Sequence, residues 1–223
     1  MESFNKKVLG EVRGKVGNKV YKSRKGKSYI ASVPSEYTMS MEPREVEKRS
    51  RFSVNTRFAK AIKSSDILYS IWDKKKAPAS SAWNKICKVN FKLCGIERPT
   101  DKNVITPAGG FKLPVLNIAE VQDGIEADIG EIKLSTEEKD VLFIMIVSFY
   151  EPVAKEEKYF NLLVLKEGKR NNNKLTFTFD LSQKLIAEKY KHKTVYMAAI
   201  ILDESGNVVR WSGSFAVEVL NGE

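Results

Sequence analysis

The sequence predicts an α+β protein with a small N-terminal β meander, a helical middle segment and a C-terminal immunoglobulin-like β-sandwich. Turn residues punctuate residues 11–33, apolar residues recur at helical spacing between 43 and 95, and short strand-like segments follow residue 112. A chain of 223 residues that is 42% hydrophobic and 30% charged can bury a core. We divide it into a basic β arm (1–33), a three-helix segment (34–97), a linker (98–112) and the sandwich (113–223).

The N-terminal meander is predicted from two turn signals, Gly17-Asn18 and Lys25-Gly26, which separate three short segments of alternating residues. Two-residue loops at both turns fix the register of three antiparallel strands. The predicted cross-strand pairs are Arg13 with Lys22, Lys22 with Tyr29, and Arg24 with Lys27.

This register makes one face of the meander basic and the other apolar, because successive side chains in a strand point to opposite faces. Like charges crowded on a small sheet destabilise it, so we expect an anion or an acidic partner to neutralise the basic face. A solvated face on a docked hairpin is the alternative. The basic face holds Arg13, Lys15, Lys22, Arg24, Lys27 and Tyr29, and the apolar face holds Val12, Val16, Tyr21 and Ile30.

Three helices are predicted after a break in the alternation at residues 34–41. Pro43 suits a first helical turn, and the third helix is capped by Ser80 or Ser81 and stopped by Gly95. A helix-turn-helix motif and a generic helical bundle both remain compatible with this spacing. The predicted helices span about 43–63, 66–75 and 81–94.

The C-terminal half begins after a Pro- and Gly-containing linker, and we expect residues 104–223 to fold as an independent domain. Eight short strands at regular spacing indicate the sandwich. One helix, at 181–190, is capped by Asp180. The predicted strands are 113–119, 126–134, 141–150, 159–165, 175–179, 194–202, 208–211 and 214–220.

Charge is distributed unevenly along the chain. Through Lys102 there are 24 basic and 10 acidic side chains, a net charge of +14, whereas the remainder has 14 basic and 18 acidic side chains, a net charge of −4. A basic excess confined to one half indicates an anionic partner, with nucleic acid ahead of a membrane surface, although a charged surface that serves only solubility is the alternative.

The residues that would support catalysis or metal binding are scarce. Two cysteines, Cys87 and Cys94, and one histidine, His192, are too few for a structural zinc site, and both cysteines are expected to be small core residues. Gly26-Lys27-Ser28 is similar to the end of a phosphate-binding loop, but Tyr21 stands where that loop needs a glycine. We expect His192 to be a surface residue with no orienting carboxylate. The protein is therefore expected not to be an enzyme and to need no cofactor or metal.

The chain shows no apolar stretch typical of a signal peptide or a membrane span. Its longest apolar run, Val141–Val147, is far shorter than the roughly 20 residues that cross a bilayer. We therefore expect a cytoplasmic protein, or one that is incorporated into a particle, with no membrane partner.

Several short motifs occur in order along most of the chain. They are Gly14-Lys15-Val16-Gly17-Asn18, Gly26-Lys27, Arg51-Phe52, Ala82-Trp83-Asn84, Asn90 and Trp211-Ser212-Gly213-Ser214. Together these motifs resemble an uncharacterised domain family seen in Bacteroidota. This resemblance implies the same order of basic start, helical middle and β end, but it implies no activity and no site. The order is also similar to that of small virion or particle assembly proteins.

These observations lead us to expect a structural or assembly protein of phage or mobile-element type, which docks on protein subunits through its basic N-terminal region. The alternative is a protein that binds DNA or RNA through the same basic face. Salt dependence distinguishes them, because phosphate contacts release counterions and an apolar subunit interface does not.

Overall fold

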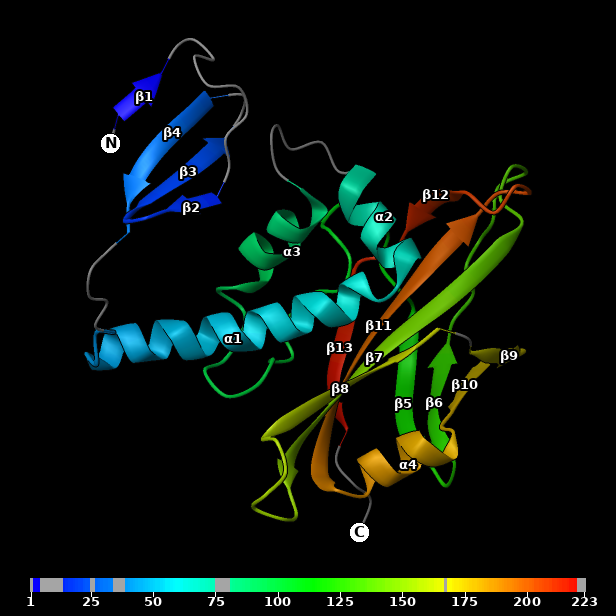
Figure 1. Ribbon diagram of the computed structural model, residues 1–223. Helices are drawn as coiled ribbons and strands as arrows, with labels where there is room; N and C mark the ends of the chain where they lie inside the picture. The colour runs from blue at the N-terminus through cyan, green and yellow to red at the C-terminus, as the bar shows by residue number, and fades with distance from the viewer. Residues whose placement is uncertain are drawn as a thin grey trace. The chain divides into compact units, whose positions relative to one another are not determined.

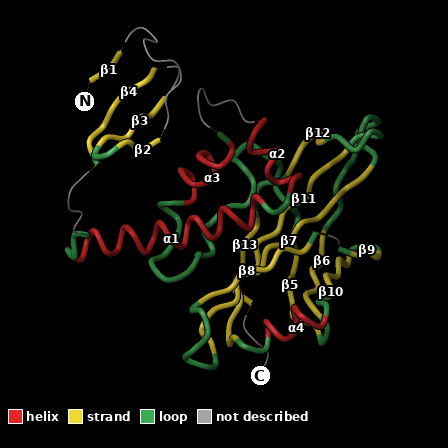
Figure 2. The backbone as a smooth tube through the Cα atoms, viewed as in Figure 1, coloured by secondary structure: helices red, strands yellow, loops and turns green. Residues whose placement is uncertain are grey.

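The computed structural model confirms the α+β class, with helices and antiparallel sheets in the order shown in Figure 1. The chain forms two compact units, Met1–Glu42 and Pro43–Glu223. Figure 2 separates the helices from the strands by colour. The structure describes residues 2–4, 14–24, 27–33, 39–74, 81–166 and 168–219.

The N-terminal unit is one antiparallel sheet in the strand order β1-β4-β3-β2. The predicted meander is confirmed, and a further strand, β1, pairs with β4. At the β2–β3 turn Gly17 has a φ of 59°, the left-handed conformation that glycine adopts without steric cost. The strands are β1 (Glu2–Phe4), β2 (Gly14–Val16), β3 (Lys19–Arg24) and β4 (Lys27–Ser32).

The second unit begins with three helices, α1 (Pro43–Lys63), α2 (Asp66–Lys74) and α3 (Ala82–Asn90). All three were predicted from apolar spacing and capping residues. Ser81 caps α3, because its side chain accepts a hydrogen bond from the Asn84 backbone N–H at 3.3 Å. The three helices form one layer against a sheet of the C-terminal half. Their buried apolar side chains form a common hydrophobic core with one face of that sheet.

Two antiparallel sheets form the C-terminal sandwich. The first has the order β5-β6-β10-β9, and the second has the order β12-β11-β7-β8 with β13 also paired to β11. The bounds are β5 (Val115–Val121), β6 (Gly124–Ile129), β7 (Asp140–Pro152), β8 (Phe160–Leu165), β9 (Lys169–Asn171), β10 (Lys174–Thr178), β11 (Tyr190–Leu202), β12 (Val208–Trp211) and β13 (Phe215–Val219).

Two predictions about local structure in this half have different outcomes. The predicted helix after Asp180 is α4 (Leu181–Ala187), where Asp180 and Gln183 form a capping box. By contrast, the sequence predicted no strand at β9, which lies between the predicted strands 159–165 and 175–179. Its three residues pair with β10, but they carry no apolar alternation that would indicate a strand.

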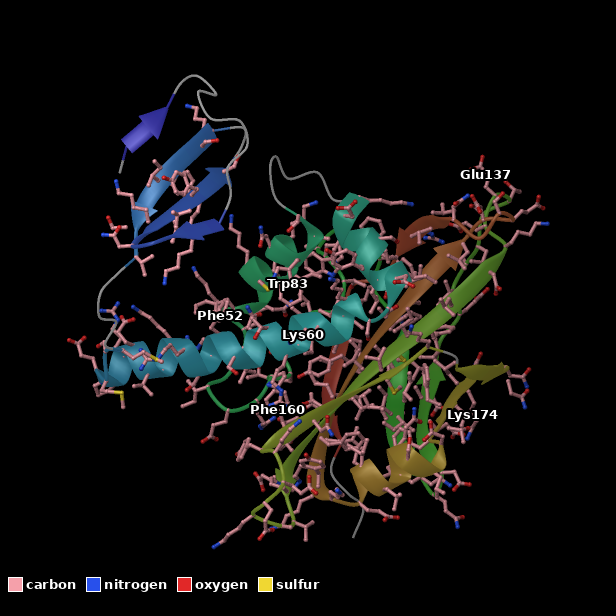
Figure 3. All side chains as sticks on the ribbon, viewed as in Figure 1. Phe52, Lys60, Trp83, Glu137, Phe160 and Lys174 are labelled. Carbon is pink, nitrogen blue, oxygen red and sulfur yellow. The ribbon has the colours of Figure 1, made fainter. Side chains whose placement is uncertain are left out.

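The strands β7 and β11 lie between two cores because both of their faces are covered. Met145, Val147 and Phe149 pack toward the first sheet, whereas Ile144 and Ile146, which alternate with them, pack against the helices. Figure 1 shows the resulting three layers of helices, second sheet and first sheet within this unit. At the edge of the second sheet, Arg57 of α1 lies 3.7 Å above the centre of the Phe160 ring on β8 (Figure 3).

The boundary between the units differs from the one expected at residues 98–112. Ile105 and Asn103 in that segment are buried, the Trp72 indole donates to the Ile105 carbonyl at 2.9 Å, and the Ile105 N–H donates to Ser214 Oγ at 2.8 Å. The segment is therefore part of the core of the second unit. The physical reason is the apolar outer face of β7 and β11, which would meet water without the helices.

None of the helices in the described ranges combines the length and apolar character needed to span a membrane.

Candidate binding surface on the N-terminal sheet

The predicted register of the N-terminal sheet is found wherever both partners are described. Lys22 pairs with Tyr29 and Arg24 with Lys27 across β3 and β4, and Lys15 of β2 pairs with Val20 of β3. These positions therefore share one face, which we call the basic face. Of the predicted residues on the two faces, Arg13 and Val12 lie outside the described residues, and Arg24 is described for its backbone only.

The basic face presents lysines around a small apolar centre. Lys15, Lys22 and Lys27 are exposed, Tyr29 is half-buried, and no ion pair involves these lysines within the described part of the chain. Val20 and Ala31 face the same side, because Val20 pairs with both Lys15 and Ala31. Val20 and Ala31 were not among the residues predicted for the basic face, although the same register places them on it.

The opposite face holds the predicted apolar residues, but it is not covered. Val16 is 64% exposed, and Tyr21 and Ile30 are only half-buried. Lys19 also belongs to this face, because it pairs with Val16 across the turn. Among residues 14–23, 27–33 and 39–42, the part of this unit whose side chains the structure describes, none is buried, so these side chains form no core of their own.

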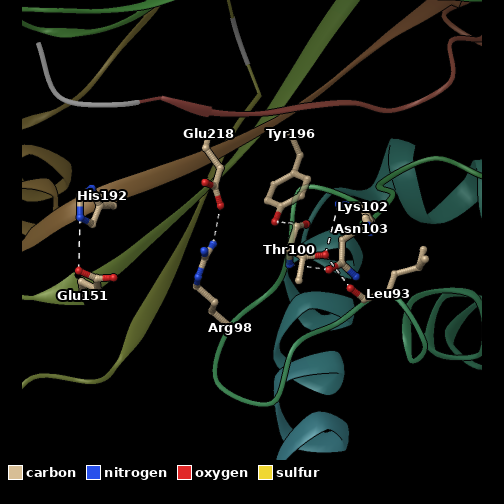
Figure 4. Close-up of polar contacts among 9 residues, drawn as sticks. All are labelled: Leu93, Arg98, Thr100, Lys102, Asn103, Glu151, His192, Tyr196 and Glu218. Carbon is tan, nitrogen blue, oxygen red and sulfur yellow. Dashed lines mark hydrogen bonds and ion pairs between the residues drawn. The ribbon is translucent and has the colours of Figure 1, made fainter.

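Elsewhere, the polar groups of the second unit are arranged as structural contacts. The Arg98 guanidinium donates a hydrogen bond of 2.9 Å to Glu218 (Figure 4). It also lies 3.7 Å from the centre of the Tyr150 ring. Arg210 Nε donates to the largely buried carboxylate of Glu138 at 2.5 Å, and this hydrogen bond lowers the pKa of Glu138. These ion pairs join segments that are distant in sequence, and in each pair the arginine is neutralised by a glutamate.

The expectation that His192 lacks a carboxylate is wrong. Its Nε2 lies 3.3 Å from the Glu151 carboxylate (Figure 4). Its ring packs with its centre 5.5 Å from that of the Tyr150 ring. The sequence could not show this contact, since it depends on the pairing of His192 with Tyr150 across β11 and β7. A histidine and one carboxylate at a surface form an ion pair when the imidazole is protonated.

The two thiols lie in the helical layer. Cys94 is buried, and its Sγ accepts a hydrogen bond from Asn103 Nδ2 at 3.2 Å. Burial raises the pKa of Cys94 to about 11 and also raises the pKa of the half-buried Cys87. Thiols in such surroundings are poor nucleophiles. In the residues that the structure describes, no group of three or more His, Cys, Asp or Glu side chains could hold a metal ion.

An open depression of about 350 Å³ lies at the side of the sandwich and is lined in part by Lys166, Asp180 and Gln183. The Asp180 carboxylate and the Gln183 side chain already satisfy each other's backbone groups in the α4 capping box. Two of the polar side chains that line the depression are therefore already engaged within the protein.

Comparison of the chain with protein-family models, with curated proteins and with solved structures finds no match in any of the three.

Proposed function

We propose that this is a non-enzymatic structural or assembly protein, a particle component of phage or mobile-element type, which docks on a neighbouring subunit through its N-terminal sheet. The observation that carries this proposal is the exposure of the apolar side chains of the N-terminal sheet. The sheet belongs to a separate compact unit, and none of the side chains described in that unit is buried.

A single sheet needs a second layer to bury its apolar side. Val16, Tyr21 and Ile30 supply apolar surface for such an interface, and each large apolar side chain that becomes fully buried contributes roughly 1.5–3 kcal/mol. A docked subunit provides that layer. The lysines lie on the opposite face of the sheet, where they favour an acidic surface on a second neighbouring subunit, so that the sheet would dock between two subunits.

The proposal takes its simplest form as self-assembly, and light scattering coupled to size-exclusion chromatography tests it. We expect the full chain to form oligomers, and we expect Lys22→Glu with Arg24→Glu to reduce their size. Lys155→Glu with Lys158→Glu is the matched control, because it makes the same charge change at exposed residues between β7 and β8. A monomeric parent at every concentration, or equal loss in both variants, contradicts the proposal.

Nucleic-acid binding through the same face is the second candidate, and the absence of described ion pairs at Lys15, Lys22 and Lys27 favours it. Phosphate contacts by these lysines would weaken steeply as salt rises. A loss of binding in the Lys22→Glu, Arg24→Glu variant that disappears at moderate salt supports nucleic acid. A salt-independent loss supports a protein partner.

A further inference from the structure

A second basic surface lies on the helical layer, in the other compact unit. From Arg49 to the end of α1 at Lys63 there are five basic residues and no acidic one. From Ala82 to Ile96, which includes α3, there are three basic residues and again no acidic one. A surface that serves only solubility ordinarily mixes both signs of charge, so a single sign over the C-terminal part of α1 and over α3 indicates an anionic partner.

Some of these cations have structural roles within the protein. Lys85 is buried and donates to the backbone carbonyls of Trp72 and Asp73, where it caps the end of α2. The Arg57 guanidinium donates to the Phe160 carbonyl at 2.6 Å, and Arg51 pairs with Glu47. These three side chains are therefore engaged inside the fold.

Arg49 also interacts within the protein, so four lysines remain for a partner. Lys60 and Lys63 of α1, Lys88 of α3 and Lys92 just after it are exposed, and no ion pair involves them among the described residues. Lys63 Nζ lies 5.8 Å from the centre of the Tyr69 ring, a contact that leaves its charge uncompensated. The acidic residues nearest to them along the chain are Asp66, at the start of α2, and Glu97, after Lys92.

Two aromatic side chains that are not fully buried lie on the same pair of packed helices, α1 and α3. The two helices are joined by a hydrogen bond of 3.1 Å from Asn55 Nδ2 to the Cys87 carbonyl. Phe52 on α1 is 56% exposed, and Trp83 on α3 is half-buried. Figure 3 labels Phe52 and Lys60 on α1 and Trp83 on the neighbouring helix α3. We define Phe52, Lys60, Lys63, Trp83, Lys88 and Lys92 as the α1–α3 face.

We propose that the α1–α3 face binds single-stranded nucleic acid. The lysines would contact backbone phosphates, while Phe52 and the accessible part of Trp83 would stack on bases, an arrangement that binds single strands with little sequence preference. An acidic protein surface would satisfy the lysines but offers no flat rings for the aromatic side chains. A duplex keeps its bases stacked inside, so it also leaves the aromatic side chains without a partner.

This inference is independent of the proposed assembly function, which concerns the N-terminal sheet. The test measures the fluorescence anisotropy of a labelled single-stranded oligonucleotide of about 20 nucleotides, titrated with the full chain at several salt concentrations. Four lysine–phosphate contacts predict a log–log salt slope of about −3. The test variant replaces Lys60, Lys63, Lys88 and Lys92 with glutamine.

We expect the test variant to bind more than about tenfold more weakly and to lose most of the salt slope, because its phosphate contacts are gone. Phe52→Ala should weaken binding about five- to tenfold with an unchanged slope, since stacking releases no counterions. The matched control replaces Lys112, Lys133, Lys155 and Lys158, all exposed elsewhere in the same unit, with glutamine. We expect the control to bind like the parent.

Other outcomes overturn the inference. A parent that does not bind at low salt overturns it, as does an equal loss in the control, which indicates non-specific attraction. Loss in the Lys22→Glu, Arg24→Glu variant with full binding by the test variant places the nucleic-acid site on the N-terminal sheet instead. Tighter binding of a duplex, with no effect of Phe52→Ala, excludes the single-strand mode. Thermal melting of every variant verifies that it is folded.

Discussion

The phenol hydroxyl of Tyr196 donates a hydrogen bond of 2.7 Å to the backbone carbonyl of Thr100 (Figure 4). Tyr196 lies in the middle of β11 and is fully buried, and its ring makes an edge contact with Phe58 of α1 at 5.0 Å. One side chain thus ties the central sheet both to the helical layer and to the segment that was expected to be a linker.

Tyr196→Phe should lower the free energy of unfolding by about 1–2 kcal/mol, because it leaves the Thr100 carbonyl without this donor and keeps the ring packing. Urea unfolding measured by tryptophan fluorescence provides the test. Tyr159→Phe is the control, since Tyr159 is 42% exposed. A loss below about 0.3 kcal/mol in Tyr196→Phe would show that the hydrogen bond contributes little.

Much of the secondary structure follows from local sequence, but the domain boundary does not. The Ser81 cap and the Asp180 capping box are local signals, and α3 and α4 begin where they predict. The boundary depends on which apolar faces meet. The run around Ile144 and Ile146 predicts a buried strand, but it cannot show that helices cover one of its faces.

A chain that begins at residue 104 is therefore expected not to fold, because it exposes Ile144, Ile146 and Tyr196, which pack against the helices. Residues 43–223 should fold cooperatively, since they form the second compact unit. Circular dichroism melting of both fragments provides the measurement. A cooperative transition in the shorter fragment would restore the boundary expected from the sequence.

The candidate surfaces were predictable to different degrees. The basic face of the N-terminal sheet follows from turn residues and strand alternation, which fix the pairing of Lys22 with Tyr29. The α1–α3 face was not predicted, although its residues lie in predicted helices. Its signal is the absence of acidic residues from two segments, and only the packing of α1 on α3 shows that the two segments are neighbours.

The Glu138–Arg210 pair makes stability depend on pH. The folded protein lowers the pKa of Glu138 below its ordinary value of 4.5, chiefly through the hydrogen bond from Arg210. The pair therefore stabilises the fold above the unfolded pKa, and its contribution is lost as the pH falls through the folded pKa. Glu138→Gln should lower the melting temperature more at pH 7 than at pH 3. An equal loss at both pH values would contradict the assignment.

The buried thiol of Cys94 should react slowly in the folded protein. With a pKa of about 11, only about one thiol in a thousand is ionised at pH 8, and the thiolate is the reactive form. A Cys87→Ser variant isolates Cys94. We expect iodoacetamide to label it in urea but hardly at all in buffer, as measured by mass spectrometry. Rapid labelling in buffer would show that this part of the helical layer opens readily.

Gly124 begins β6 at a point where β10 approaches so closely that no side chain fits. A Cβ atom at this position would lie 1.9 Å from the backbone oxygen of Phe177, and Phe177 is itself fully buried. Gly124→Ala therefore requires the backbone of β6 or β10 to move, which disturbs the pairing of Gly124 with Thr178 and the packing of Phe177 in the core between the sheets. We expect a loss of about 2 kcal/mol or more in the free energy of unfolding, measured in urea.

Gly213→Ala is the matched control for Gly124→Ala, because a Cβ at Gly213 meets its nearest neighbour, the Phe111 carbonyl oxygen, at 3.8 Å, which is an ordinary contact. The control should change stability by less than about 0.5 kcal/mol. If the two variants were equally stable, the close approach of β6 and β10 would not constrain the sandwich.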